Sequence, residues 1–374
     1  MTRLDDAVAT PRRSEVWVDN LRVTLIAGVI VVHTATAYVV DVPWYYDDER
    51  TSSHAWTVLP GFPVFAGGVF GLGALFFVAG WFSVGSLERR GPSGFARSRL
   101  LRLGAPLLVF VLLLQPLTDY VGNLRSERGS FAYYLGMTEV SVMWFVAALL
   151  TFSLAYAGLR RVRPGARSPG SARPGVVVVT AVATAAVGCL AVWQVWPWNA
   201  DMFLNLRFGE WPQGAVLFAL GVHAAETGWI GLLQPPFTRR LGRVAAVGAA
   251  ALAALFGAEV AWGDVDELLQ AEALGPTIGF AALDGLVSVT WTLWCVAWFR
   301  RRWTGHGQLL STASRASYAT YVVHPLVLTT LMVAFGSVAL LPELKFLVIS
   351  AAGVPACFVV GHVLTRMPGV SEVL

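Results

Sequence analysis

Charged residues are scarce in this chain, and their scarcity defines the class of protein. Of the 374 residues, 13% are charged and 56% are hydrophobic. A soluble domain of this length cannot bury so many apolar side chains in one core. Apolar runs of about 18–25 residues, long enough to cross a hydrocarbon core of ~30 Å, recur along the chain. We therefore expect an all-α, polytopic membrane helix bundle surrounded by the lipid bilayer.

Features of several other protein classes are missing. The three cysteines, Cys189, Cys295 and Cys357, all lie in apolar stretches and show neither a disulfide pattern nor metal-ligand spacing. We find no glycine-rich phosphate loop, zinc motif, nucleophile elbow or internal repeat. We therefore expect no bound cofactor and no metal.

About ten apolar stretches are candidate transmembrane helices. The first follows a polar start with Arg12 and Arg13, which indicates a retained signal anchor. We expect a cytoplasmic tail at 1–18, a transmembrane domain at 19–366 and a second cytoplasmic tail at 367–374. The stretches lie near residues 20–40, 61–86, 103–122, 140–159, 176–198, 212–227, 244–262, 275–299, 314–336 and 344–365.

The basic residues predict the orientation of these helices. Most of the 27 lysines and arginines fall before the first stretch, after the last, or in the loops at 89–102, 160–173, 239–243 and 300–315. These loops all lie on one side if the stretches cross in alternation. The positive-inside rule then places both termini in the cytoplasm. The basic residues behind the net charge of +4 are thus mostly signals for membrane orientation, which argues against nucleic-acid binding.

Two ionisable residues interrupt the first apolar stretch. Arg22 and His33 are 11 residues apart, which is about three helical turns, so they share one face about 16 Å apart. Ionisable groups within a span usually face a bundle interior and mark functional sites. Two structural alternatives remain open: a histidine bonded to a neighbouring helix, and an arginine that snorkels beside Asp19.

The loops on the other side combine aromatic and acidic residues. Residues 41–60 include Trp44 and Asp48, and residues 193–211 include Trp196 and Glu210. Such aromatics are usually interfacial anchors. The same combination also suits a sugar, which presents flat apolar faces and many hydroxyls.

Five segments resemble the acyltransferase-3 family of integral membrane acyltransferases over about residues 17–370. Two departures from its pattern are Val18 in place of Leu and Ala79 in place of Ser. The segments are 18–22 (VDNLR) with the later His33, 74–82 (ALFFVAGWF), 95–106 (FARSRLLRLGAP), 144–146 (WFV) and 314–325 (SRASYATYVVHP). Residues 211–213 (WPQ), 217–221 (LFALG) and 366–370 (RMPGV) are similar to the glucan-biosynthesis protein C branch, whose members succinylate glucans.

The resemblance implies transfer of an acyl group across the membrane. Cytoplasmic acyl-CoA, as succinyl-CoA or acetyl-CoA, would be the cosubstrate, and a hydroxyl of an envelope glycan the acceptor. A base near neutral pH suits this chemistry, and imidazole supplies one. His33 is then a general base or a transient acyl carrier. Arg22 would hold the thioester oxygen or a CoA phosphate.

The remaining candidates are substrate-binding residues that the resemblance implies. With spans entering near Leu21 and Ala316, we expect His33 roughly 18 Å deep and His324 roughly 12 Å deep, so both would line one chamber. Two carboxylates in predicted spans, Asp284 and Glu259, are left unassigned. The substrate-binding candidates are Arg97, Arg99, Arg102, Trp144, Tyr321 and His324.

Three alternatives stay open at this stage. A small secreted metabolite such as a macrolide is an alternative hydroxyl acceptor. A secondary transporter would use the same buried His33 and Arg22, although such transporters often carry repeats. A non-enzymatic partner in polysaccharide assembly would need larger outer loops. The alanine-, arginine- and glycine-rich composition is typical of a GC-rich bacterium, so we expect the bacterial plasma membrane.

The loop charges predict the sidedness of reporter fusions. A reporter fused after Arg163 or Arg301 should lie in the cytoplasm, and one fused near Asp48 or Asp266 should lie outside, because the basic loops stay inside. Paired alkaline phosphatase and fluorescent-protein fusions measure this. Reversed signals at both loop pairs would contradict the predicted orientation.

Overall fold

The computed structural model describes residues 16–39, 44–46, 62–124, 130–165, 173–196, 204–262, 274–305 and 307–370, with backbone alone at 62–70, 255–262 and 274–276. In these residues every regular element is a helix. The elements are α1 Val16–Tyr38, α3 Phe62–Arg99, η2 Leu100–Gly104, α4 Ala105–Val109, η3 Phe110–Leu114, α5 Gln115–Gly122, α6 Phe131–Tyr134, η4 Ser141–Met143, α7 Trp144–Val162, α8 Pro174–Trp193, η5 Phe208–Glu210, α9 Trp211–Thr227, η6 Trp229–Leu232, α10 Pro235–Trp262, α12 Leu274–Arg302, α13 Gln308–Phe335 and α14 Pro342–Leu364.

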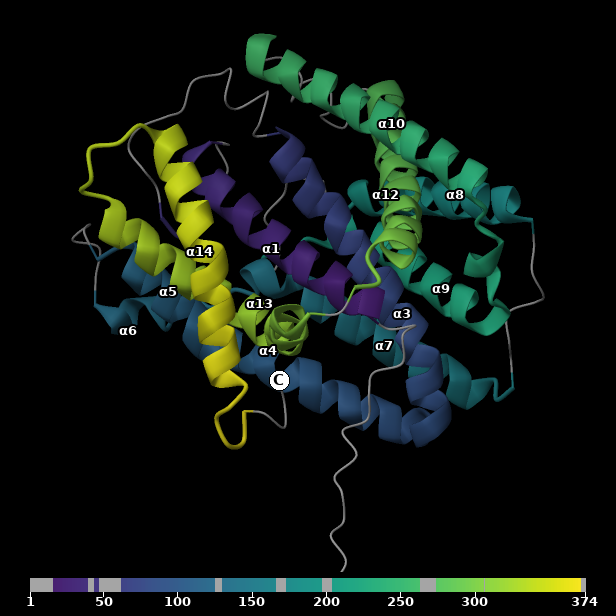
Figure 1. The fold of residues 1–374 in the computed structure, drawn as a ribbon, viewed down its shortest axis with the longest axis horizontal. Helices are drawn as coiled ribbons and strands as arrows, with labels where there is room; N and C mark the ends of the chain where they lie inside the picture. Colours follow the sequence, from purple (N-terminus) through teal and green to yellow (C-terminus); the bar gives the residue numbers. More distant parts are fainter. Residues whose placement is uncertain are drawn as a thin grey trace, which may run out of the picture.

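Helix α1 lies in the middle of the bundle (Figure 1) and packs against α3, α13 and α14. Two polar side chains tie its first turn to its neighbours. Asn20 Nδ2 donates to the Trp303 carbonyl at 3.0 Å, and Ser314 Oγ donates to Asp19 Oδ1 at 2.7 Å. The residues at 19 and 20 therefore set the axial position of α1, and with it the depth of His33.

The long helix α3 contains a break. Gly91 has φ 67° and ψ 167°, a backbone conformation that glycine adopts without a Cβ penalty, and Pro92 follows. The chain then continues through two π-helical turns, η2 and η3. π-helical turns are rare and occur mainly at functional sites. η2 follows directly on Arg99 and contains Arg102, so this irregular segment carries two of the predicted substrate-binding arginines.

Seven segments of the described chain are long and apolar enough to cross a membrane. One of them, Gly71–Gly122, has 52 residues and includes the break at Gly91, so it covers two of the stretches expected from the sequence. Helix α9, with 17 residues, and helix α10 are not among the seven. Each of the ten expected stretches coincides with a helix. The count of ten crossings and the cytoplasmic position of the termini stay predictions.

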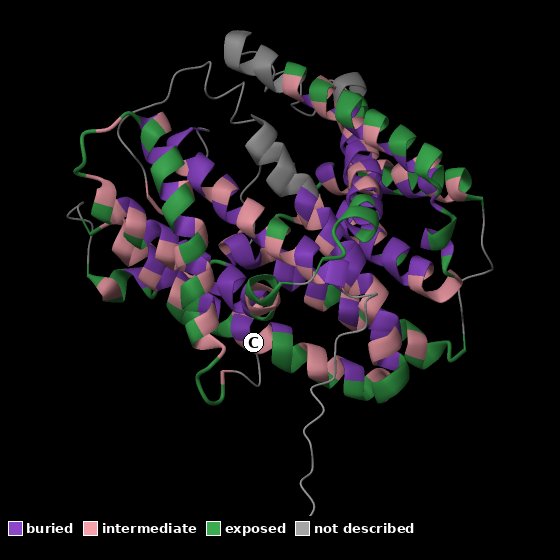
Figure 2. Ribbon diagram, in the orientation of Figure 1, coloured by how far each residue is buried: buried purple, intermediate pink, exposed green. Residues whose placement is uncertain are grey.

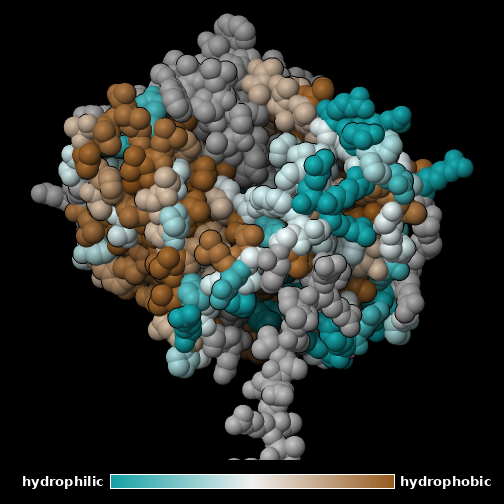
Figure 3. Space-filling view, in the orientation of Figure 1, coloured by the Kyte–Doolittle hydropathy of each residue, from teal (hydrophilic) through white to brown (hydrophobic). Residues whose placement is uncertain are grey.

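The outer surface of the bundle is apolar where a lipid would contact it. Buried residues gather toward the interior, whereas α14 and α10 carry exposed ones (Figure 2). Hydrophobic side chains cover the face over α14 and hydrophilic ones gather on the opposite side of the same view (Figure 3). Leu344, Leu347, Val359 and Val363 of α14 are all exposed. A helix that is apolar on all sides is typical of a membrane span, so the described segments form a multi-pass membrane protein.

A close helix contact in the described part of the chain joins α3 and α9 through two glycines. A Cβ at Gly80 would lie 2.0 Å from the Phe218 carbonyl oxygen, and one at Gly221 would lie 2.0 Å from the Phe77 carbonyl oxygen. Small residues permit such close approach of backbones in membranes. We expect Gly80→Ala to destabilise the protein by about 1–3 kcal/mol because the two helices must separate. Thermal unfolding in detergent measures this.

Gly28→Ala is the control for that substitution. A Cβ at Gly28 in α1 would meet nothing within 4 Å, so alanine there should be neutral or slightly stabilising through its helix propensity. Equal melting temperatures for the two variants would contradict the packing argument.

Candidate functional site

The two predicted active-site histidines are in direct contact. His33 Nδ1 lies 2.9 Å from His324 Nε2, although the residues are 291 positions apart in sequence. The rings are nearly coplanar, with an interplanar angle of 8° and centroids 5.0 Å apart. This edge-to-edge geometry is that of an in-plane hydrogen bond. Helices α1 and α13 thus bring the two imidazoles together inside the bundle.

The hydrogen-bond partners of His324 indicate which of its ring nitrogens carries the proton. His324 is fully buried, no described carboxylate contacts it, and its Nδ1 lies 2.6 Å from the Tyr321 carbonyl. A carbonyl only accepts, so Nδ1 of His324 is the donor, and a buried imidazole without an anion stays neutral. Its Nε2 is then an acceptor, and His33 Nδ1 donates to it. The Nε2 of a neutral His33 keeps its lone pair.

Tyr321 packs against the histidine pair and is itself hydrogen-bonded to the backbone. Its hydroxyl donates to the Val142 carbonyl at 2.5 Å, and its ring centroid lies 5.5 Å from that of His324. The side chain is buried at 4% exposure. In this conformation the hydroxyl of Tyr321 is engaged with the backbone of η4, while its own carbonyl anchors His324.

Trp44 covers one face of His33. The indole and imidazole rings stack at 4.5 Å with an interplanar angle of 18°. The next residue, Tyr45, donates its hydroxyl to Ser141 Oγ at 2.8 Å. Burial raises the pKa of Tyr45, which keeps this hydroxyl protonated as a donor. The segment 44–46 is thereby fixed as a cap on the histidine pair, and His33 itself is only partly exposed.

The predicted arginines gather toward the other end of α1. The Arg22 guanidinium lies 5.6 Å from the centre of the Phe82 ring. Arg99 lies over Phe95 at 4.9 Å and donates to Ser83 Oγ at 3.2 Å. The positive charges of Arg22 and Arg102 act on Arg99. Arg22, Arg99 and Arg102 therefore form one group, in which Arg99 is partly buried and Arg102 is exposed. Arg97 is also exposed, and the structure does not bring it to this group.

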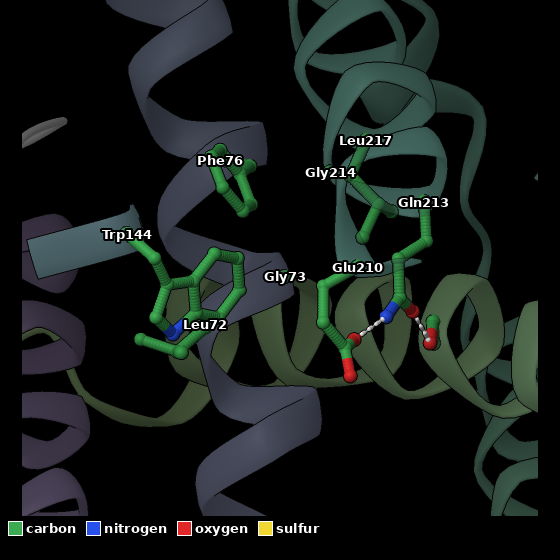
Figure 4. A pocket seen from close by; sticks show the side chains of 9 residues that line it. Leu72, Gly73, Phe76, Trp144, Glu210, Gln213, Gly214 and Leu217 are labelled. Carbon is green, nitrogen blue, oxygen red and sulfur yellow. Dashed lines mark hydrogen bonds between the residues drawn. The ribbon is translucent and has the colours of Figure 1, made fainter. Parts of the chain in front are cut away.

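Trp144 lies away from the arginines, in the wall of a small pocket of about 10 Å³, which has room for one water-sized group. The pocket is drawn in Figure 4, with Trp144 facing Glu210 and Gln213 across it. Gln213 donates to Glu210 and accepts from the Ser288 hydroxyl. The pocket is lined by Leu72, Gly73, Phe76, Trp144, Glu210, Gln213, Gly214, Leu217 and Ser288.

The two unassigned carboxylates do not contact the histidines in the described structure. Asp284 is buried, with its Oδ2 3.9 Å from Cys189 Sγ, and it interacts electrostatically with Glu210. The side chain of Glu259 lies outside the described residues. Within the described part of the chain, no three His, Cys, Asp or Glu residues form a group that could hold a metal.

Comparison with known families decides the class of the protein. The profile of the acyltransferase-3 family, described as an acyltransferase domain, matches residues 15–362. The chain belongs to this family. It is therefore a membrane-embedded acyltransferase that transfers groups other than aminoacyl groups. Searches of the curated proteins and of the solved structures found no match.

The structure groups the predicted residues of this acyltransferase into three places. His33, His324 and Tyr321 meet in the bundle, Arg22, Arg99 and Arg102 meet at one end, and Trp144 lines the pocket. Sequence reasoning did not find the roles of Trp44 and Gln213. The signals for the pocket were Trp144, the resemblance at 211–213, and the mixture of aromatic and acidic residues at 193–211, which included Glu210 without a partner.

Proposed function

We propose that the protein transfers an acyl group, such as succinyl or acetyl, from cytoplasmic acyl-CoA to a hydroxyl of an acceptor at the outer face. An envelope glycan is the favoured acceptor because residues 211–221 resemble the glucan-biosynthesis protein C branch. The single observation that carries the proposal is the hydrogen-bond chain from the Tyr321 carbonyl through His324 to His33. This hydrogen-bond chain leaves Nε2 of His33 as a basic nitrogen that can take a proton in a protein of an acyltransferase family.

His33 is the general base of this reaction. Its Nε2 takes the proton from the acceptor hydroxyl as the hydroxyl oxygen attacks the thioester carbonyl. The tetrahedral intermediate then expels the CoA sulfur, which receives the same proton from the His33 imidazolium. The products are an ester and free CoA, and the histidine returns to its neutral form. Proton transfer of this kind is efficient because imidazole titrates near neutral pH.

His324 orients the base. A neutral imidazole exists as two tautomers, and only one of them leaves Nε2 of His33 unprotonated. The acceptor at His324 Nε2 selects that tautomer, and the buried Tyr321 carbonyl holds His324 in turn. The stacked Trp44 ring restricts rotation of the His33 ring. His324 thus acts through His33.

The arginine group receives the CoA part of the donor. Arg22 is about 16 Å from His33 along α1, too far to hold the thioester carbonyl that His33 serves. Guanidinium groups bind phosphate oxygens in pairs, and Arg99 is held by Phe95 and Ser83 beside Arg22. The phosphates therefore bind at Arg22, Arg99 and Arg102, with the thioester arm extended along α1. We propose that this end faces the cytoplasm and that the membrane is a bacterial plasma membrane, and the positive-inside rule applied to the basic loops supports this orientation.

Loss of the base should abolish the reaction. We expect His33→Ala to lower the rate of acyl transfer by a factor of about 10²–10⁴, the usual contribution of general-base help. The measurement is acyl-CoA consumption by purified protein, with mass spectrometry of the esterified glycan to identify the acyl group. His362→Ala, near the end of α14, is the matched control. Near-normal transfer by folded His33→Ala protein would refute the assignment.

Two variants separate the orienting role of His324 from packing. His324→Gln places an amide oxygen near the position of Nε2, so it still accepts from His33 Nδ1. His324→Leu fills similar space without an acceptor. We expect His324→Leu to lower kcat at least about tenfold, with the KM values little changed, and His324→Gln to restore much of this loss.

The outcome distinguishes orientation from substrate binding. A raised acceptor KM with unchanged kcat in both variants would indicate that His324 binds the acceptor directly. Equal losses of kcat in His324→Gln and His324→Leu would show that a hydrogen-bond acceptor for His33 Nδ1 at position 324 does not contribute to the rate.

A further inference from the structure

The pocket beside Trp144 has one apolar and one polar wall. Leu72 and Phe76 of α3 form the apolar side with the indole, and the side chains of α9 and η5 form the polar side (Figure 4). The pocket lies at the end of α7 and α9 that is opposite to the Arg160–Glu226 ion pair, whose charged atoms are 3.4 Å apart. It is therefore remote from the basic ends of these helices.

The polar wall is preorganised by one amide. Gln213 is held on both sides, because its Nε2 donates to Glu210 and its Oε1 accepts from Ser288. This arrangement occupies one carboxylate oxygen of Glu210 and leaves the other without a described hydrogen-bond partner. In Figure 4 that second oxygen points away from Gln213. An oriented carboxylate oxygen that lines a pocket is a hydrogen-bond acceptor for a ligand.

The groups around Glu210 oppose the effect of burial on the pKa of its carboxyl group. Burial raises the pKa of Glu210, and the nearby Arg207 guanidinium and the Gln213 amide oppose that rise. The same Arg207 acts electrostatically on His33. The carboxylate of the pocket and the catalytic imidazole therefore share a charged neighbour. Asp284 lies behind the polar wall and adds a second carboxylate to the surroundings of Glu210.

The backbone around the pocket is strained. Leu204, Asn205 and Arg207 adopt positive φ values of 58°, 55° and 48°, and Ser141 on the other flank has φ 44°. The Val140 amide donates to the Leu204 carbonyl at 2.8 Å and joins the two strained segments. Non-glycine residues seldom adopt this left-handed conformation because it is sterically strained, and those that do cluster at functional sites. The strain here fixes the position of Glu210 and of the turn before Trp144.

We propose that this pocket is a specificity subsite for the acceptor, which binds an uncharged hydroxyl-bearing group through Glu210 and rejects an anionic group. The proposal rests on the acyl transfer proposed above. A hydroxyl donates to the available oxygen of Glu210, and the apolar part of the ligand lies against Trp144. A carboxylate or phosphate on the ligand would meet the carboxylate of Glu210 and would be repelled.

The test compares two series of acceptors with purified protein and acyl-CoA. The probes are neutral glucose oligosaccharides and uronic-acid oligosaccharides of the same length, which differ by one carboxylate per unit. We expect wild-type protein to acylate the neutral series in preference. Glu210→Gln should raise the acceptor KM for the neutral series about tenfold through loss of a charge-assisted hydrogen bond. It should also reduce the discrimination against the anionic series.

A matched substitution controls for the loss of a carboxylate. Glu226→Gln makes the same change at the other end of α9, 16 residues away, where the side chain pairs with Arg160. We expect its acceptor KM to stay within about twofold of the wild-type value. Ser288→Ala provides a second, milder test, because it removes the donor that orients Gln213. Its acceptor KM should rise less than that of Glu210→Gln while the donor KM stays unchanged.

The outcomes separate this subsite from the proposed reaction. A neutral-series KM that Glu210→Gln leaves unchanged, or preference of wild-type protein for the anionic series, would overturn the subsite. Thioester hydrolysis without transfer to either series would also count against a hydroxyl-binding pocket. Absence of any thioester consumption by wild-type protein would instead contradict the proposed use of acyl-CoA.

Discussion

The in-plane hydrogen bond between His33 and His324 is the contact on which the other features of the site depend. It joins helices α1 and α13 at a depth set by the tethers of Asp19 and Asn20 to the neighbouring helices. A buried imidazole must satisfy its polar atoms inside the bundle, because no water replaces a missing partner. The Tyr321 carbonyl meets this requirement for His324 Nδ1, and the Trp44 ring stacks on His33 and covers its face. Each hydrogen-bonding atom of the pair therefore has a single role, as a donor or as an acceptor.

Opposite charges gather in two regions of the described bundle. Cations gather where Arg22 and Arg99 lie, and carboxylates gather at the pocket with Glu210 and Asp284. His33 lies between the two groups on the same helix as Arg22. An anionic donor and an uncharged acceptor would thus approach from regions of opposite charge. In the proposed reaction this separation would direct the donor and the acceptor to different ends of the bundle without a conformational change.

Close packing and strain hold this arrangement in place. Glycines at 80 and 221 allow α3 and α9 to touch through their backbones, which brings Phe76 toward the residues of the pocket. On the far side of the pocket, left-handed residues at 204–207 fix the turn before Glu210. Both features cost conformational freedom, and both are localised around the polar wall.

The sequence alone determined the membrane class, the position of the helices and the family, because hydrophobic length and local motifs are readable in one dimension. It also singled out His33 and Arg22, since ionisable residues are conspicuous in apolar helices, and His324 through the resemblance to the family. Tertiary structure decided their partners. The contact between residues 33 and 324, the cap by Trp44 and the Gln213 bridge join segments far apart in the chain. Such contacts depend on helix rotation and depth, which the packing of the whole bundle sets and no local pattern records.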